Sequence, residues 1–120
     1  MNWIALDSTA AVLEISKLSN SIPQVIFKHS SRCSISAVAK QRIERSDVIV
    51  KQYPLVNFYL LDVILHREVS QFIGEFFKVH HESPQILLIK NEICVYDESH
   101  LEINPSEVFE AIQPYLSDNK

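Results

Sequence analysis

The chain has 120 residues, a hydrophobic content of 47% and a formal net charge of −4 at pH 7, which suits one globular domain spanning residues 1–120. The acidic balance argues against nucleic acid as a partner, and the single glycine excludes glycine-rich phosphate loops. No apolar run approaches the ~20 residues that a membrane span needs. The start of the chain has no signal-peptide pattern. We therefore expect a cytoplasmic monomer that binds neither nucleic acid nor membrane, with its two cysteines as free thiols.

The first half of the chain predicts two strands, each followed by a helix. Residues 3–6 suit a short edge strand, after which Asp7 or Ser8 offers a helix N-cap. The helix that follows carries three apolar residues at helical spacing, namely Val12, Ile15 and Leu18. Residues 19–23 end it, and residues 24–28 are typical of a buried strand. The next predicted helix runs from about residue 34 to 46, with one apolar face made of Ile35, Val38, Ala39 and Ile43.

The second half predicts three strands and two helices. Residues 56–63 are rich in β-branched and aromatic side chains, which favours a central strand. A helix from about 67 to 79 has a predicted inner face of Val69, Phe72, Ile73 and Phe76. Residues 86–89 and 93–96 form a hairpin around residues 90–92. The last helix begins at Pro105 behind an Asn104 N-cap, its regular hydrogen bonding is expected to end at Pro114, and its inward residues are Val108, Ala111, Ile112 and Tyr115.

This order of elements predicts an α/β fold. A strand–helix–strand start implies parallel neighbouring strands, whereas a hairpin near the end implies an antiparallel pair. We therefore expect a mixed four- to five-stranded sheet flanked by helices on both faces.

The most informative segment is residues 28–36, Lys-His-Ser-Ser-Arg-Cys-Ser-Ile-Ser, where a strand gives way to a helix. Backbone N–H groups and the dipole at a helix start favour negative charge. Cys33 at that point should form the thiolate, the reactive form of cysteine, more readily, and Lys28, His29 and Arg32 add positive charge nearby. The alternative is an inert loop cysteine. We predict that Cys33 is a nucleophile.

The order of elements, the cysteine at the first strand–helix junction and Ser83-Pro84 before the hairpin together resemble a thioredoxin-like fold. More narrowly, the chain is similar to the monothiol bacilliredoxin, or YtxJ-like, family. This resemblance rests on residues 27–36 and on residues 81–85, His-Glu-Ser-Pro-Gln, and Trp3 and Ser99-His100 also fit it.

The resemblance implies thiol–disulfide exchange with bacillithiol, a low-molecular-weight cytosolic thiol that acts as a co-substrate, with no bound cofactor. Cys33 would attack the mixed disulfide of a bacillithiolated protein, take up bacillithiol and release the repaired protein, after which another thiol would regenerate Cys33. Alternatives are a non-catalytic thioredoxin-like peptide-binding module, a general monothiol exchange factor and an iron–sulfur carrier. The bulky Ile35 and the lack of a glycine beside it disfavour the iron–sulfur carrier.

Four further residues complete the site that the resemblance implies. Ser36 stands where dithiol relatives have a second cysteine; it either donates a hydrogen bond to the Cys33 thiolate or merely occupies the first helical turn. Arg32 either pairs with the carboxylates of bacillithiol or is a solvated loop residue. Ser83 and a cis Pro84 would face Cys33 and present the Ser83 backbone to an incoming peptide.

The other titratable residues have structural interpretations. Cys94 lies in a hairpin strand, where a buried structural cysteine is favoured over a resolving or sensing thiol. For Asp62 the alternatives are a buried proton-accepting carboxylate, as in some thioredoxins, and a strand-end residue that faces water or caps the next helix, and we favour the second. His80 and His81 read as solvated loop residues, and only His29 lies near enough to Cys33 to modulate it. The five histidines lack ligand spacing, so no metal site is expected.

Overall fold

The structure is a computed structural model that describes residues 1–50 and 55–117. Its elements are, in chain order, β1 (Ile4–Ala5), α1 (Thr9–Leu18), β2 (Gln24–His29), α2 (Ser34–Glu44), α3 (Asp47–Val50), β3 (Asn57–Asp62), α4 (Arg67–Phe77), β4 (Gln85–Lys90), β5 (Ile93–Ser99), the 3₁₀ turn η1 (His100–Glu102) and α5 (Pro105–Ser117). The predicted α/β order is confirmed. The one-turn elements α3 and η1 are additions to it.

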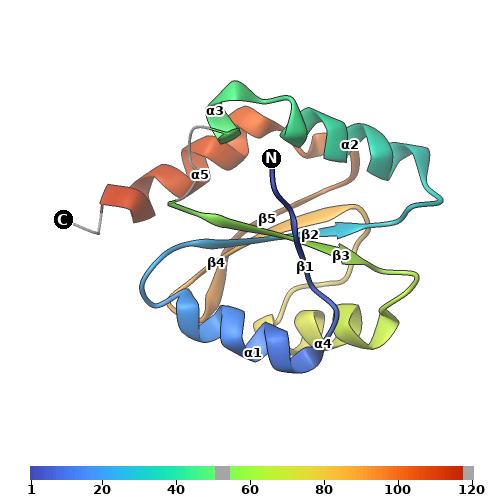
Figure 1. Cartoon of the computed structure of the whole chain (residues 1–120), viewed down its shortest axis with the longest axis horizontal. Coiled ribbons are helices and arrows are strands. Elements are labelled where there is room, and N and C mark those ends of the chain that lie inside the picture. Colours follow the sequence, from blue (N-terminus) through green and yellow to red (C-terminus); the bar gives the residue numbers. More distant parts are fainter. Residues whose placement is uncertain (51–54, 118–120) are drawn as a thin grey trace.

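The five strands form one mixed sheet in the order β1-β3-β2-β4-β5 (Figure 1). Strands β1, β3 and β2 run parallel, β4 runs antiparallel to β2, and β5 runs antiparallel to β4. His29 lies opposite Asp62, and Lys28 lies opposite Gln85. The ends of β2 and β3 and the start of β4 therefore meet at one edge of the sheet.

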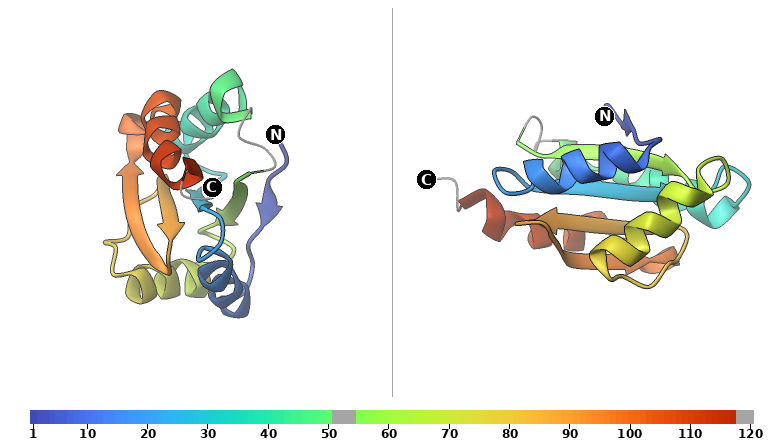
Figure 2. Two further views of the ribbon diagram at one scale, coloured as in Figure 1. Left: turned by 90° about the vertical axis from the view of Figure 1, so that its left-hand side faces the viewer. Right: turned by 90° about the horizontal axis from the view of Figure 1, so that it is seen from below.

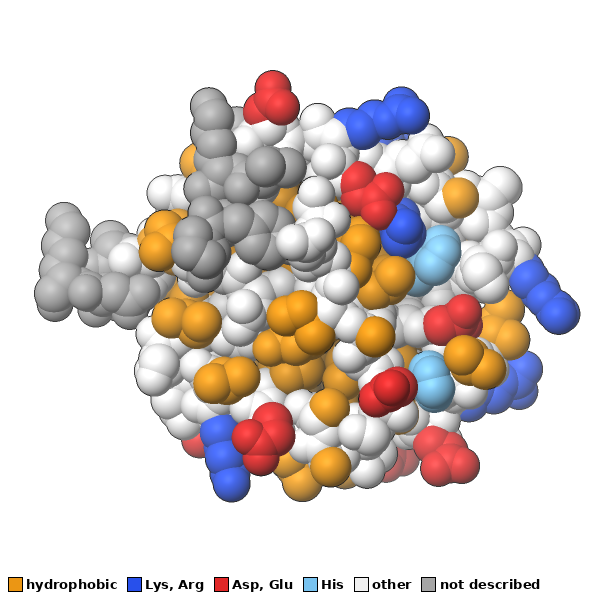
Figure 3. Space-filling view, in the orientation of Figure 1, with side chains coloured by type: hydrophobic (Ala, Val, Ile, Leu, Met, Phe, Trp, Pro, Cys, Tyr) orange, Lys and Arg blue, Asp and Glu red, His pale blue; other side chains and the backbone are white. Residues whose placement is uncertain are grey.

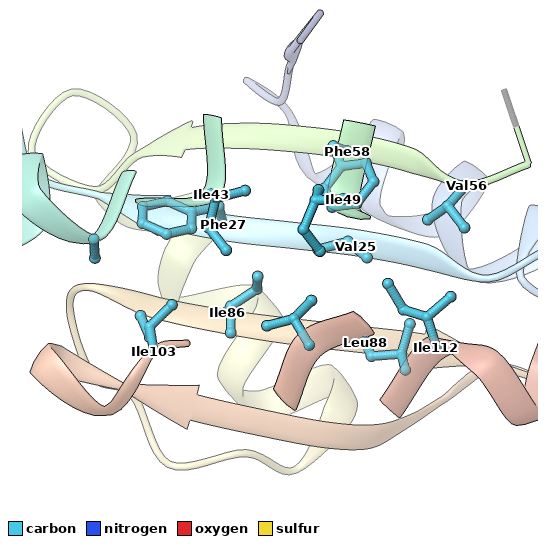
Figure 4. Close-up of a cluster of buried hydrophobic side chains, with 12 residues drawn as sticks. Val25, Phe27, Ile43, Ile49, Val56, Phe58, Ile86, Leu88, Ile103 and Ile112 are labelled. Atoms are coloured by element: carbon cyan, nitrogen blue, oxygen red, sulfur yellow. The ribbon is translucent and has the colours of Figure 1, made fainter. Parts of the chain in front are cut away.

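Helices cover both faces of the sheet, as predicted. In Figures 1 and 2, α2, α3 and α5 lie on one face and α1 and α4 on the other. Figure 4 shows the core under α2, α3 and α5, to which Val25, Phe27, Ile43, Phe58, Ile86, Leu88 and Ile112 contribute. The second core, under α1 and α4, includes Val12, Ile15, Ile26, Leu61, Val69, Ile73, Phe77, Leu87 and Ile89. Because β2 has a core on each face, all of its residues from Gln24 to Lys28 are buried.

Local hydrogen bonds explain where the helices begin. The Ser8 hydroxyl accepts the N–H of Ala11 at 3.1 Å, which makes Ser8 the N-cap of α1. Asp62 Oδ1 accepts the N–H groups of Ile64 and Leu65, at 2.9 and 3.0 Å, and so caps the turn that leads into α4. Asn104 Oδ1 accepts the N–H of Ser106 at the start of α5. The capping roles of Ser8, Asp62 and Asn104 were expected from the sequence.

The buried faces of α2 and α4 differ from the predicted ones. In α2 the buried stripe is Ser36, Ala39 and Ile43, while Ile35 and Val38 are exposed. In α4 the buried stripe includes Val69, Ile73 and Phe77, while Phe76 is 40% exposed and Phe72 is partly buried. Apolar residues next to the buried stripe satisfy the same helical period, so periodicity alone left the rotation of each helix about its axis undetermined.

Two helix ends also differ from expectation. Leu18 belongs to the predicted apolar stripe of α1, but as the last residue of that helix it is 46% exposed, unlike Val12 and Ile15. Helix α5 continues through Pro114 to Ser117 rather than ending there. Proline removes one backbone donor, and packing of the inner face of α5 on the sheet keeps the helix going. Val108, Ala111, Ile112 and Tyr115 face or pack against the core as predicted.

The surface over β1 mixes charge signs. Figure 3 shows Lys and Arg side chains interspersed with Asp and Glu around a central group of hydrophobic side chains. Across residues 1–50 and 55–117, no helix combines the length and the apolar character that a bilayer span requires.

Candidate active site

Cys33 is the N-cap residue of α2, with an extended backbone at φ −112° and ψ 121°. Its carbonyl accepts the N–H of Ala37 at 3.1 Å, which starts the helix, and its own N–H donates to the Ser30 carbonyl at 3.2 Å. The thiol is free and half-buried. Cys33 therefore stands at the N-terminal end of α2, where the helix dipole is positive, and solvent still reaches the residue.

The Ser36 hydroxyl fastens the loop that carries Cys33. Ser36 is fully buried one turn into α2; its Oγ accepts the Ser30 N–H at 3.0 Å and lies 2.5 Å from His29 Nδ1. Burial, and then the positive charge of Lys40, lowers the pKa of His29. A neutral ring accepts at one nitrogen, so we assign the Ser36 hydroxyl as the donor to Nδ1. A hydrogen bond from Ser36 to the Cys33 thiolate stays a prediction.

The Ser83-Pro84 turn lies next to the end of β2, from which the Cys33 loop starts. The peptide bond is cis, as expected, and the Pro84 carbonyl accepts the N–H of His100 at 2.9 Å. The register that sets Lys28 against Gln85 places Pro84 next to the end of β2. The Ser83 hydroxyl oxygen is buried without a hydrogen-bond partner in the described structure. Arg32 is exposed in the Cys33 loop. The roles of Arg32, Ser83 and Pro84 in binding a substrate stay predictions.

Cys94 is far from this site. It lies opposite Ile89, which in turn pairs with Gln24 at the start of β2, and it packs against the core under α1 and α4. Its thiol donates to the Tyr96 carbonyl at 3.3 Å, and burial raises the pKa of the thiol to about 11. Cys94 therefore belongs to the other face and the other end of the sheet from Cys33, which agrees with its structural interpretation.

Sequence reasoning missed a buried cluster around Lys28. Its Nζ donates to the Ser70 carbonyl at 3.2 Å and to His81 Nδ1 at 3.1 Å, and burial lowers the pKa of Lys28 to about 8. His81 Nδ1 also lies 3.2 Å from the Ser70 hydroxyl. His81 is exposed in its loop, as predicted, but its Nδ1 also contacts Lys28 and Ser70, which the sequence did not predict. The signal in the sequence is that Lys28 continues an apolar strand buried on both faces.

The neighbouring loop holds a second group of ionisable residues. His80 has a side chain 88% exposed, as predicted for a solvated residue, and its Nε2 lies 3.4 Å from the Glu82 carboxylate. The same carboxylate lies 3.2 Å from His100 Nε2. Among residues 1–50 and 55–117, no three His, Cys, Asp or Glu side chains come together as a possible metal site.

Comparisons with known proteins agree with this geometry. Residues 4–108 match the family described as "Monothiol bacilliredoxin BrxC". A solved structure described as a candidate oxidoreductase with a thioredoxin fold has a TM-score of 0.78 and 28% identity, over 90% of this chain and 91% of that chain.

Two thioredoxins share the fold at lower identity. The Malassezia sympodialis protein, Mala s 13, has a TM-score of 0.72 and 17% identity, over 96% of this chain and 91% of that chain. The Fasciola hepatica protein has a TM-score of 0.71 and 19% identity, over 93% of this chain and 98% of that chain. The expected thioredoxin-like fold is confirmed.

Proposed function

Because the chain belongs to the monothiol bacilliredoxin family, we propose that it is a cytosolic enzyme that removes bacillithiol from protein mixed disulfides through Cys33. The family and the fold support the broader class, a thiol–disulfide oxidoreductase. The observation that carries the proposal is the half-buried Cys33 thiol at the N-cap of α2, with serine rather than a second cysteine at position 36.

The proposed reaction exchanges one disulfide for another. The Cys33 thiolate attacks the bacillithiol sulfur of a protein–bacillithiol disulfide, a Cys33–bacillithiol disulfide forms, and the substrate protein leaves as a thiolate that takes a proton from water. A second low-molecular-weight thiol, as thiolate, then attacks the bacillithiol sulfur, takes bacillithiol as a new disulfide and returns Cys33 as a thiolate. Cys94 is too remote to resolve the intermediate, so the reducing thiol comes from solution.

The surrounding residues take supporting roles in this proposal. Ser36 positions the loop through its bonds to His29 and Ser30. Ser83 and the cis Pro84 form the wall against which the substrate chain lies, and the Ser83 backbone offers it a hydrogen bond. Arg32, exposed on the same loop, supplies a guanidinium for the carboxylates of bacillithiol.

Turnover of a bacillithiolated protein tests the proposal. The protein is mixed with excess bacillithiolated substrate and with bacillithiol as the regenerating thiol, and the release of substrate thiol is followed over time. We expect release well beyond one equivalent per enzyme with the wild type and with Cys94→Ser, and only the uncatalysed background with Cys33→Ser.

The same experiment separates catalysis from binding. A peptide-binding module would release at most one equivalent and stay joined to the substrate or to bacillithiol through Cys33. Equal rates for Cys33→Ser and the wild type would refute the proposed nucleophile.

A further inference from the structure

A pocket of about 690 Å³ lies along α4, against the chain that follows this helix. In Figure 1 this helix is on the lower face of the sheet, opposite α2. Val63, Ile64 and Val79 give the pocket an apolar wall, and Arg67, Glu75 and His81 give it charged and polar groups. Cavities of this size with a few polar groups on apolar walls are typical of small-molecule sites.

A buried positive charge lies behind one wall of the pocket. Lys28 is 0% exposed, and its Nζ donates to the Ser70 carbonyl and to His81 Nδ1, both of them uncharged acceptors. In the described part of the chain no carboxylate pairs with this ammonium. An unpaired buried charge is costly, and an anion in the pocket would offset that cost.

Lys28 also sets the orientation of His81 toward a ligand. Since His81 Nδ1 accepts from Lys28, the ring hydrogen is on Nε2, which leaves Nε2–H as a donor. Arg67 precedes Ser70 by three residues on α4, so both lie on the same side of the helix. Arg67 therefore lies on the side of α4 that carries Ser70, which contacts both the Lys28 ammonium and the His81 ring.

Asp7 and Glu68 line a neighbouring pocket together with Arg67, and Glu75 and Glu82 lie near the pocket along α4, without a direct ion pair to Arg67 or Lys28 in the described residues. Glu75 is eight residues along α4 from Arg67, about 12 Å on a helix. The Glu82 carboxylate is shared between His80 and His100. Neither acid neutralises Arg67 or Lys28 through a direct ion pair in the described residues.

We propose that this pocket binds a small organic acid with two carboxylates. The two negative charges balance Arg67 and Lys28, one carboxylate accepts hydrogen bonds from the Arg67 guanidinium and His81 Nε2–H, and the carbon body lies against Val63, Ile64 and Val79. This site goes beyond the proposed thiol exchange, since Cys33 does not line it.

An NMR titration of the full chain at pH 7 tests the site with succinate. We expect saturable shifts of the amides of Ser70, Gln71 and His81, and at least tenfold weaker binding of the neutral isostere succinamide and of inorganic phosphate. Arg67→Gln should weaken succinate binding at least tenfold, about 1.4 kcal/mol. The matched control Arg45→Gln removes an exposed charge at the end of α2, on the other face, and should bind succinate as the wild type does.

Three results would overturn the proposal. The first is the absence of a saturable amide shift up to about 10 mM succinate, which would mean a binding free energy weaker than about 3 kcal/mol. The second is equal affinity for succinate and for succinamide or phosphate. The third is an equal loss of succinate affinity in Arg67→Gln and Arg45→Gln. Cys33→Ser should bind succinate normally, so loss of thiol exchange and loss of this site are separate outcomes.

Discussion

The Ser36 hydroxyl shows how a single atom can hold the Cys33 loop. Its oxygen accepts the Ser30 N–H and lies 2.5 Å from His29 Nδ1, and the residue is fully buried. His29 and Ser30 precede Cys33 in the chain, whereas Ser36 follows it. The hydroxyl therefore links the two ends of the loop that carries Cys33. Serine at this position therefore has a structural purpose that is independent of any contact with the sulfur.

Removal of that hydroxyl should destabilise the fold. In Ser36→Ala, the partly buried Ser30 N–H and His29 Nδ1 lose their partner, which costs about 1 kcal/mol of unfolding free energy. Urea denaturation measures this cost. Ser34→Ala, at an exposed position in the first turn of the same helix, should stay within about 0.5 kcal/mol of the wild type. Equal stabilities of the two variants would contradict the closing role of Ser36.

Lys28 should give the protein a distinct alkaline response. The pKa of this amine in the folded chain is about 8, below the 10.5 of an exposed lysine, because it is buried. Below pH 8 both folded and unfolded chains are protonated here, and the burial cost is present in full. Between pH 8 and 10.5 the unfolded chain holds more protons, so this group adds stability as pH rises, by up to about 3 kcal/mol.

The variant Lys28→Met isolates this effect. Cys94 and Tyr96, acids whose pKa values burial raises to about 11 and about 12, lower stability at alkaline pH in both proteins and cancel in the difference. We expect the wild type to gain stability relative to Lys28→Met as pH rises from 8 to 10.5, measured by urea denaturation at each pH. Parallel pH profiles would show that the amine is not buried as a cation.

At the level of elements, short sequence motifs correctly predicted those features that depend on interactions between residues close in the chain. The order of elements along the chain, the caps at Ser8 and Asn104, and the two turns at Cys33 and Ser83-Pro84 all follow from short stretches of sequence. The contacts of Lys28 were not predictable in this way, because Ser70 and His81 lie 42 and 53 residues further along the chain. Pairs so distant meet only once the sheet and α4 are in place.

Helix α4 gives the sharpest contrast between periodicity and packing. Phe77 is 7% exposed and belongs to the core, whereas its neighbour Phe76 is 40% exposed and stacks on Phe72 at 5.3 Å between ring centroids. Phe77→Ala should cost about 3–5 kcal/mol through the cavity that it leaves. Phe76→Ala should cost about 1 kcal/mol, since it loses mainly an exposed aromatic contact. Denaturant unfolding compares the two, and a larger loss for Phe76→Ala would mean that α4 is rotated from the orientation described.

For the whole molecule, the sheet keeps the two thiols apart. Cys33 follows the end of β2 on the α2 face, while Cys94 lies level with the start of β2 on the α1 and α4 face. Five strand residues alone span about 16 Å, and a disulfide needs Cα atoms within about 7 Å. The folded chain therefore has one thiol available for exchange and no internal partner for it.

This separation predicts how the folded protein responds to an oxidised small thiol. Bacillithiol disulfide at pH 7.5 should add one bacillithiol per chain, at Cys33, because a thiol with a pKa of about 11 is only about three parts in ten thousand thiolate at that pH. Intact-mass analysis with peptide mapping measures the adduct. In denaturing urea both cysteines should react, since the burial that protects Cys94 is gone. An adduct on Cys94 in the folded protein, or a chain oxidised without an adduct, would mean that the sheet does not hold the two sulfurs apart, and the requirement for an external reducing thiol would no longer follow.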